Sequence, residues 1–427
     1  MTDSEDSNIE KAHPPRQVIK RNGDVIDFNP EKITNAITKA MNRLEEEHRT
    51  DPNHITNQVI DSFIDDEDDV VDVDTIHKLV ENTLMDNKCY EIARSYITYR
   101  ENHKPNIFRE RIFYKPFEYP ELSQFVDAIE QSYWIVTEFN FTSDINDYKT
   151  NLTIEEKECI RRSMLAISQI EVAVKEFWGK IGDKFPKPEI QEVGATIAEN
   201  EVRHSRAYSH LLELLGLNNE FEHVFKIPSI NKRIDVTQRA LKDKNCSDKD
   251  FIRSLVLFSI IVENVSLFSQ FLIISTINKE KAALKGMTNV VSATSLEEDL
   301  HFKFGAALIN TIRKEHPEMF DDELDKIVRE TVEQSYEAEK EIIHWIFDQG
   351  ELDYLSIDDV IEYIKNRYNR GMKECGFNPL FPVNDNKLEK TKWFDIQNTV
   401  TMHTDFFDKR PVNYSKFSSS FDEDSLF

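Results

Sequence analysis

A single acidic residue, Glu263, interrupts the most apolar stretch of this chain and limits what the chain can fold into. The stretch reads FIRSLVLFSIIVENVSLFSQFLIIS, from Phe251 to Ser275, and is apolar on nearly every face of a helix. A helix of this kind belongs inside a protein. A lone carboxylate is costly there unless it is paired or bound to a metal ion. The sequence therefore predicts a buried site that supplies partners for Glu263.

Candidate partners for Glu263 occur on three other predicted helices. One helix carries a single glutamate and two carry a Glu-x-x-His motif, which together give Glu171, Glu201, His204, Glu298 and His301. Residues i and i+3 lie on the same side of a helix, so each motif offers one oxygen and one nitrogen to one face. The order Glu, Glu-x-x-His, Glu, Glu-x-x-His is the set that four helices need to hold two metal ions. Mixed oxygen and nitrogen ligands suit iron or manganese.

The Glu-x-x-His motif alone is a weak signal. It also occurs at Glu45/His48, Glu220/His223 and Glu341/His344. We interpret these pairs as surface or loop residues, because each lies in strongly polar sequence. The repeated order and the apolar context distinguish the chosen set. The alternative is that its glutamates are solvated and its histidines are satisfied core residues.

Composition favours a large, mainly helical protein and excludes some classes of function. The chain has 427 residues, enough for more than one domain, with only 10 glycines and 14 prolines. The net charge of −26 argues against a general surface for DNA or RNA. Four scattered cysteines form no Cys-x-x-Cys pair or zinc spacing, which suits a reducing cytosol. We therefore expect a cytoplasmic protein, and the polar, acidic start MTDSEDSNIE is not a secretory signal.

A membrane span is the alternative explanation of the apolar stretch. Residues 254–274 have about the length that a spanning helix needs. However, Glu263 and Asn264 fall at the centre of this segment, where a charge is costly. The flanking sequence also has the pattern of ordinary helices outside membranes. We therefore expect no contact with a membrane.

The chain divides into four predicted segments. Residues 1–17 form a flexible leader, and residues 18–104 a small α+β domain with a β-hairpin and four helices. The hairpin is predicted because two short alternating runs flank a tight turn at Asn22-Gly23. Residues 105–385 read as long helices with short connections, and residues 386–427 as a flexible tail, rich in serine and acidic residues at its end.

The helical part resembles a known family. The motifs KPEI…AENEVRHSRAYSH, the Glu263 helix and SLEEDLHF resemble the small, radical-generating subunit of class I ribonucleotide reductase, a ferritin-like helical bundle. The resemblance implies that a dinuclear centre of iron, manganese or both is held by Glu171, Glu201, His204, Glu263, Glu298 and His301. The best-known members have aspartate at the first position, where this chain has Glu171.

The same resemblance implies residues for storing and exporting an oxidising equivalent. Tyr208 matches the tyrosine that carries a stable radical in many members, although some branches keep the oxidising equivalent on the metals. Trp134 and Glu297 match the start of the transfer route, and Tyr414 resembles the tyrosine that relays across the subunit interface. The terminal FDEDSLF resembles the peptide that docks on the large catalytic subunit. The alternatives are a core tyrosine, a core tryptophan, a surface glutamate and an unspecific tail.

The first domain is similar to the ATP-cone, a nucleotide-sensing module. The matching segments are VIKRNGDVIDFNPEKI and LVENTLMDNKCYEIARSYITYR. The resemblance implies nucleotide contacts from Lys20, Arg21, Asn22, Lys32 and, more weakly, His77. Cationic groups at a tight turn and a helix start can surround a triphosphate. The alternative is a basic hairpin turn without a ligand.

ATP-cones usually precede the large subunit, and here one precedes the small subunit. We therefore expect this chain to carry its own switch, with ATP activating and dATP inhibiting. The switch would act on a homodimer through a higher oligomer such as a tetramer.

The whole sequence predicts the small subunit of ribonucleoside-diphosphate reductase, active only with a separate large subunit that binds the ribonucleotide. Two other functions fit part of the pattern. A ferritin-like dimetal oxidase of a small substrate would share the six ligands and would not need Trp134 or Tyr414. A nucleotide-gated metal-binding scaffold would have no radical chemistry.

Overall fold

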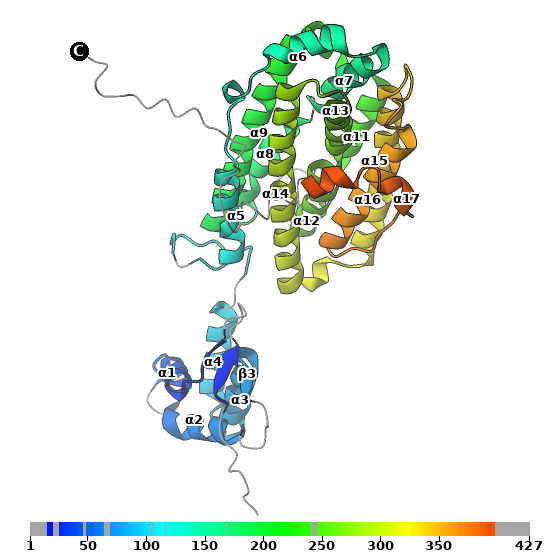
Figure 1. The fold of residues 1–427 in the computed structure, drawn as a ribbon. Coiled ribbons are helices and arrows are strands. Elements are labelled where there is room, and N and C mark those ends of the chain that lie inside the picture. The colour runs from blue at the N-terminus through cyan, green and yellow to red at the C-terminus, as the bar shows by residue number, and fades with distance from the viewer. Residues whose placement is uncertain are drawn as a thin grey trace, which may run out of the picture. The chain divides into compact units, whose positions relative to one another are not determined.

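The computed structural model describes residues 15–19, 25–45, 48–63, 69–103, 106–115, 117–168, 170–240 and 246–397, with the backbone alone for residues 102–103, 171–173 and 239–240. The chain divides into two compact units, residues 1–105 and 106–427. Figure 1 shows a small unit with strands and a large unit made of long helices. The predicted turn at residues 20–24, including Lys20, Arg21 and Asn22, lies outside the described residues.

The first unit contains a small three-stranded sheet. Strand β1 (Gln17–Ile19) pairs antiparallel with β2 (Val25–Asp27), in the register Val18 opposite Ile26. The predicted β-hairpin is therefore confirmed. Strand β3 (Val70–Asp72) pairs with β1 in parallel and completes the order β2-β1-β3. The sequence did not predict β3, because a three-residue strand directly before a helix carries no alternating pattern of its own.

Four helices, together with the sheet, build the core of the first unit. They are α1 (Pro30–Met41), α2 (Pro52–Asp61), α3 (Val73–Asp86) and α4 (Tyr90–His103). The Asn29 side chain accepts a hydrogen bond from the Glu31 backbone N–H at 2.8 Å, and Pro30 occupies the first turn of α1. Ile37, Ile55 and Val80 are completely buried in the shared core.

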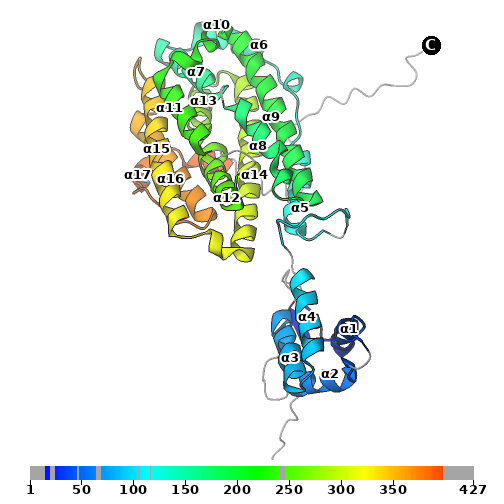
Figure 2. The same ribbon diagram turned by 180° about the vertical axis from the view of Figure 1, so that it is seen from behind.

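The second unit is a bundle of long helices. Its helices are α5 (Pro120–Gln131), α6 (Thr142–Asn146), α7 (Ile154–Ile167), α8 (Glu171–Gly179), α9 (Pro188–Leu215), α10 (Asn218–Phe221), α11 (Pro228–Ala240), α12 (Asp248–Leu257), α13 (Phe268–Lys281), α14 (Lys285–Glu315), α15 (Asp322–Ile346), α16 (Ile357–Glu374) and α17 (Asp385–Leu388). Short 3-10 turns are η2 (Val136–Glu138), η4 (Ile181–Asp183), η5 (Val224–Lys226) and η7 (Pro317–Met319), and η3 (Asp147–Asn151) is a π turn. Helices α8, α9 and α14 lie side by side in both views (Figures 1 and 2).

The apolar stretch forms the central helix of this bundle. Helix α12, the π-helical segment η6 (Phe258–Ser266) and α13 follow one another along it. Every residue from 254 to 277 is buried. In the part of the chain that the structure describes, the run Asp248–Lys281 alone is long and apolar enough to cross a membrane, and its apolar window is entirely buried inside the protein. The apolar stretch is therefore a core helix of the protein, as the acidic residue Glu263 at its centre predicted.

A contact with α16 holds the π-helical segment in place. The Arg367 Nε donates to the backbone oxygen of Asn264 at 2.8 Å, and the Asn264 side-chain Nδ2 donates to the Arg367 backbone oxygen at 2.6 Å. The guanidinium of Arg367 also lies 3.4 Å from the ring centroid of Phe268. A π-helix has a different hydrogen-bond ladder from an α-helix. The Asn264–Arg367 hydrogen bonds therefore help to stabilise a backbone that lacks the α-helical ladder.

Two glycines let neighbouring helices approach η6. A Cβ atom added at Gly371 of α16 would lie 2.5 Å from the Asn264 Nδ2, and one added at Gly305 of α14 would collide with the Ser259 side chain. The absence of a side chain at both positions therefore allows the contact of α14 and α16 with the segment that carries Glu263.

Residues 386–397, which the sequence assigned to the flexible tail, pack against the bundle. Leu388 and Phe394 are buried, and the Asp395 carboxylate accepts hydrogen bonds from the Tyr363 hydroxyl at 3.2 Å and from Arg367 at 3.3 Å. Residues 398–427, including Tyr414 and the segment FDEDSLF, lie outside the described residues, as do residues 1–14 of the predicted leader.

We predict that Gly371→Ala destabilises the bundle by about 1–3 kcal/mol, the usual cost of overpacking a core. The new methyl group would displace the Asn264 amide and weaken its hydrogen bond to Arg367. Urea denaturation of the full chain measures this change. Gly179→Ala is the matched control, because its methyl group would meet only Ala198 at an ordinary 3.6 Å. Equal unfolding free energies for Gly371→Ala and the wild type would contradict the prediction.

Candidate metal centre

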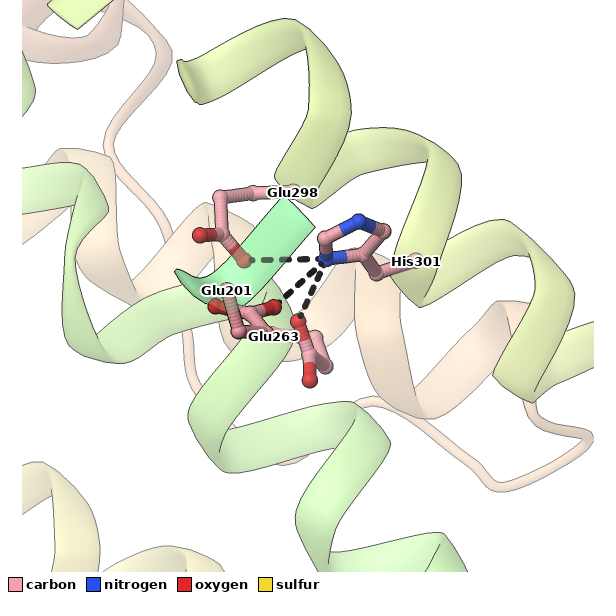
Figure 3. A group of neighbouring side chains, drawn as sticks. All are labelled: Glu201, Glu263, Glu298 and His301. Atoms are coloured by element: carbon pink, nitrogen blue, oxygen red, sulfur yellow. Dashed lines mark ion pairs between the residues drawn. The ribbon is translucent and has the colours of Figure 1, made fainter. Parts of the chain in front are cut away.

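Three carboxylates and an imidazole converge in the core of the bundle. Glu201 comes from α9, Glu263 from η6, and Glu298 and His301 from α14. One ligand atom from each residue lies within 4.8 Å of the corresponding atoms of the other three, and all four residues are buried. Figure 3 shows the carboxylates directed at the same side of the His301 ring.

The His301 Nδ1 atom is at the centre of these contacts. It lies 2.9 Å from Glu201 Oε1, 3.5 Å from Glu263 Oε2 and 3.6 Å from Glu298 Oε2 (Figure 3). His204 of α9 adds a second imidazole. Its Nδ1 lies 3.3 Å from Glu201 Oε2 and 3.2 Å from Glu298 Oε1. Five of the six predicted ligands are therefore brought together.

The sixth predicted ligand is Glu171. It is the first residue of α8, which packs along α9. Its side chain lies outside the described residues. Its role as a ligand stays a prediction.

The innermost ligand atoms of the cluster fit a bound cation. Four buried atoms contact groups of opposite charge but make no hydrogen bond of good geometry among the described residues: Glu201 Oε1, Glu263 Oε2, Glu298 Oε1 and His301 Nδ1. Metal–ligand bonds of about 2.1 Å place neighbouring donor atoms about 3 Å apart. The N–O distances around His301, from 2.9 to 3.6 Å, agree with such a shell. Carboxylate oxygens combined with imidazole nitrogens suit iron or manganese.

The electrostatics of the cluster also favour a cation. Burial raises the pKa of Glu263 well above its usual value, and repulsion from Glu298 and Glu201 adds to this effect. At Glu201 burial acts in the same direction, but contacts with the two imidazoles outweigh it and lower the pKa. Burial opposes protonation of His204, yet the surrounding carboxylates raise its pKa well above the usual range. Because imidazole and carboxylate ligands bind a metal ion in their deprotonated forms, cation binding at this cluster would compete with proton binding at the imidazoles.

A second carboxylate on α14 connects the cluster to a tryptophan. Glu297 Oε2 accepts a hydrogen bond from the Trp134 indole N–H at 2.9 Å and lies 2.8 Å from His204 Nε2. The Trp134 and His204 rings are stacked, with centroids 6.0 Å apart. Because a carboxylate only accepts hydrogen bonds, His204 carries a proton on Nε2 in this contact. Its Nδ1 is the atom that faces Glu201 and Glu298.

Further groups fix the orientation of Glu297. Arg203 Nη2 and the Ser132 hydroxyl both donate to Glu297 Oε1 at 3.1 Å. Arg203 Nη1 also donates to the Trp134 backbone oxygen at 3.0 Å. Both oxygens of this completely buried carboxylate are therefore engaged. Of the predicted transfer residues, the structure brings Trp134 and Glu297 together and leaves Tyr414 outside its described part.

Tyr208 lies one helical turn after His204 on α9. Its side chain is 1% exposed, and its ring centroid is 6.5 Å from that of His204. The structure therefore places this tyrosine in the core beside the cluster.

Sequence reasoning missed two residues that contact the proposed ligands. The Trp178 indole N–H donates to Glu263 Oε1 at 2.6 Å, and Asn200 Nδ2 lies 3.3 Å from His301 Nε2. The available signals were weak. Trp178 stands two helical turns after Glu171, and Asn200 directly precedes Glu201.

The predicted nucleotide contacts are only partly described. Lys32 is exposed in the first turn of α1. His77 is half-buried on α3, and its Nδ1 lies 2.8 Å from the Tyr96 hydroxyl. The positions of Lys20, Arg21 and Asn22 lie in the undescribed turn, so these nucleotide contacts stay predictions.

The Glu-x-x-His pairs that we set aside lie on the surface. All six side chains are exposed: Glu45, His48, Glu220, His223, Glu341 and His344. The interpretation of these pairs as surface residues is confirmed.

Comparison with known proteins identifies both parts of the chain. Residues 111–387 match the family model for the small chain of ribonucleotide reductase, and residues 16–105 match the ATP cone domain. The ribonucleoside-diphosphate reductase subunit beta of Treponema pallidum is 23% identical over 320 residues, which cover 72% of this chain and 88% of that protein.

Solved structures share the fold of the helical unit. The ribonucleotide reductase R2 subunit from Clostridium botulinum has a TM-score of 0.58 at 18% identity, covering 66% of this chain and 89% of that one. The dimanganese(II) NrdF of Streptococcus sanguinis has a TM-score of 0.59 at 14% identity, covering 68% of this chain and 99% of that one. The predicted ferritin-like fold is confirmed.

We predict that Glu263→Ala abolishes binding of at least one metal ion per chain. The substitution removes a buried ligand and leaves His301 without one of its three facing carboxylates. Elemental analysis after loading with Mn(II) or Fe(II) measures the loss. Glu341→Ala is the matched control, because it removes an exposed glutamate from a Glu-x-x-His pair outside the cluster. Normal metal content in Glu263→Ala would count against the assigned site.

Proposed function

Because this chain belongs to the ribonucleotide reductase small-chain family, we propose that it forms an oxidising equivalent at a dinuclear metal centre and passes it to a separate large subunit. The large subunit would bind the ribonucleoside diphosphate. Alone, the chain would reduce no nucleotide. The ATP cone would control this activity.

The observation that carries this proposal is the single carboxylate between the buried cluster and Trp134. A metal store or an oxidase of a small substrate needs ligands, but it does not need a hydrogen-bonded tryptophan attached to one of them. Glu297 joins Trp134 to His204 through the same oxygen, Oε2, with contacts of 2.9 and 2.8 Å. This arrangement favours electron transfer over metal storage.

We propose that the six predicted ligands, Glu171, Glu201, His204, Glu263, Glu298 and His301, hold two ions of manganese, iron or one of each. When bound, these ions supply the oxidising equivalent. The described oxygen and nitrogen donors support either metal. The name of the Streptococcus sanguinis protein, which shares the fold, states that its centre is dimanganese.

In this scheme, the residues around Trp134 would receive its indole proton when its ring loses an electron. When the Trp134 ring loses an electron, its indole N–H becomes more acidic, and Glu297 Oε2 is in place to take that proton. Arg203 and Ser132, which donate to the other oxygen, keep the carboxylate oriented during this step. Tyr208, buried beside His204, would hold the stable radical in this scheme.

Trp134 also lies close to the surface of the bundle. It is buried, while its neighbours Tyr133 and Ile135 are exposed. The path of an electron from the protein surface to Trp134 is therefore short. We propose that Tyr414 continues the route at the interface and that the terminal FDEDSLF docks on the large subunit.

The ATP cone would act as the activity switch. Lys20, Arg21, Asn22, Lys32 and His77 are the proposed contacts of the nucleotide. ATP would favour the active homodimer, and dATP a larger assembly such as a tetramer. Supporting this, the cone folds around its own hydrophobic core, so it can respond to a ligand as a unit.

Electron paramagnetic resonance of the metal-loaded, oxygen-exposed protein tests the radical function. The proposal requires a signal from high-valent metal or an organic radical. A sample that stays silent under all loading conditions would support the scaffold function instead.

We predict that Trp134→Phe lowers ribonucleoside diphosphate reduction by about a hundredfold or more, equivalent to about 2.7 kcal/mol. Phenylalanine keeps an aromatic ring at this position, but it lacks the indole N–H and is much harder to oxidise. Turnover is measured with the large subunit, and metal content and the paramagnetic signal should match the wild type. Trp345→Phe, which changes a tryptophan beside Arg162, is the control. Unchanged turnover in Trp134→Phe would remove this route.

We predict that ATP and dATP bind the first unit and give assemblies of different mass. Light scattering with each nucleotide over a wide concentration range measures this, and identical masses would remove the switch. Lys32→Ala should raise the Kd about tenfold, because a charge-assisted hydrogen bond contributes about 1.5 kcal/mol. Lys39→Ala, an exposed lysine in the last turn of the same helix, should leave the Kd unchanged.

A further inference from the structure

Trp178 of α8 makes a buried hydrogen bond to Glu263, a residue of the cluster. Its indole N–H on α8 donates to Glu263 Oε1 on η6 at 2.6 Å. Trp178 is completely buried and Glu263 is 1% exposed. A hydrogen bond to a charged acceptor in such a place is among the stronger ones in proteins.

The two oxygens of Glu263 therefore have different surroundings. Oε1 faces away from the cluster and accepts the indole hydrogen bond. Oε2 lies 3.5 Å from His301 Nδ1 and has no hydrogen bond among the described residues. A carboxylate can bind a cation through one oxygen or through two. Here one oxygen is already engaged.

The ring of Trp178 has little freedom to move. The rings of Phe177, Phe258 and Phe304 pack around it, with centroids 5.3, 5.9 and 5.6 Å away. Gly305 lies so close that a Cβ atom added there would be 3.5 Å from the indole. Since protein interiors are close-packed, the direction of the indole N–H is fixed by these neighbours from three elements.

We propose that Trp178 is a positioning residue that restrains Glu263 so that only Oε2 is offered to a metal ion. This inference rests on the metal site of the proposed function. Trp178 acts through Glu263 and does not itself touch the metal. Its N–H would stabilise the charge on the engaged oxygen and prevent the carboxylate from rotating to bind through both oxygens.

Trp178→Phe tests the inference through metal affinity. The substitution removes the N–H and keeps an aromatic ring in the pocket. Losing an outer hydrogen bond to a ligand commonly weakens metal binding by about 10–100-fold, and we expect a loss in this range for Mn(II), measured by titration followed by electron paramagnetic resonance. We also expect the Mn(II) line shape to change, because both oxygens of Glu263 become available.

Two further variants separate positioning from packing. Phe177→Leu loosens one of the rings around Trp178 and keeps the indole N–H, so it should weaken Mn(II) binding less than Trp178→Phe does. Trp345→Phe repeats the same chemical change far from the cluster in sequence and should bind Mn(II) within about twofold of the wild type. If Phe177→Leu loses as much affinity as Trp178→Phe, or if Trp178→Phe binds like the wild type, the inference is overturned.

A crystal structure of the wild-type full chain loaded with Mn(II) gives a test that does not depend on any variant. We expect Glu263 Oε2 at bonding distance from a metal ion and Oε1 still hydrogen-bonded to Trp178. Both oxygens bound to metal would refute the positioning role. A wild-type chain that binds no manganese or iron would overturn the proposed function as well, whereas normal metal binding with a doubly bound Glu263 would overturn this inference alone.

Discussion

The burial of like charges in the bundle core is the constraint on which the rest of this structure depends. Glu201, Glu263 and Glu298 lie within a few ångströms of one another without access to water. Carboxylates in such a place repel one another and lose their hydration. The two imidazoles offset part of this cost, and a divalent cation would offset more. This charge must be held in place. That need accounts for the apolar helix around Glu263, for the close packing of α14 and α16 against it, and for the hydrogen bonds that surround the ligands.

His204 shows how the bundle combines two tasks in one side chain. Consecutive residues of α14 contact its two nitrogens: Glu297 faces Nε2 at 2.8 Å and Glu298 faces Nδ1 at 3.2 Å. Nδ1 therefore contacts the cluster, whereas Nε2 contacts Glu297, which is hydrogen-bonded to Trp134. Any change of charge at the cluster alters the acidity of the Nε2 proton, so the cluster and the tryptophan are electrostatically coupled through a single ring.

Much of this organisation could be predicted from the sequence, because its signals are local. The hairpin, the helices of the first unit and the two Glu-x-x-His motifs depend on neighbouring residues, and the apolar context of Glu263 separated the buried motifs from the exposed ones. Contacts between distant segments could not be predicted in the same way. Strand β3 depends on parallel pairing with β1, and the partners Trp178 and Arg203 depend on how helices pack.

The π-helical segment η6 has a consequence for the alignment of the whole central helix. Each residue of an α-helix turns the chain by about 100°, so the loss or gain of one residue between Phe258 and Ser266 would rotate everything beyond it by that angle. Glu263 would then face a different neighbour, or the long apolar run after it would turn its packed side away from α7 and α14. Length in this segment is therefore as constrained as residue type. Tolerance to insertion and deletion should fall sharply at the boundaries of these nine residues.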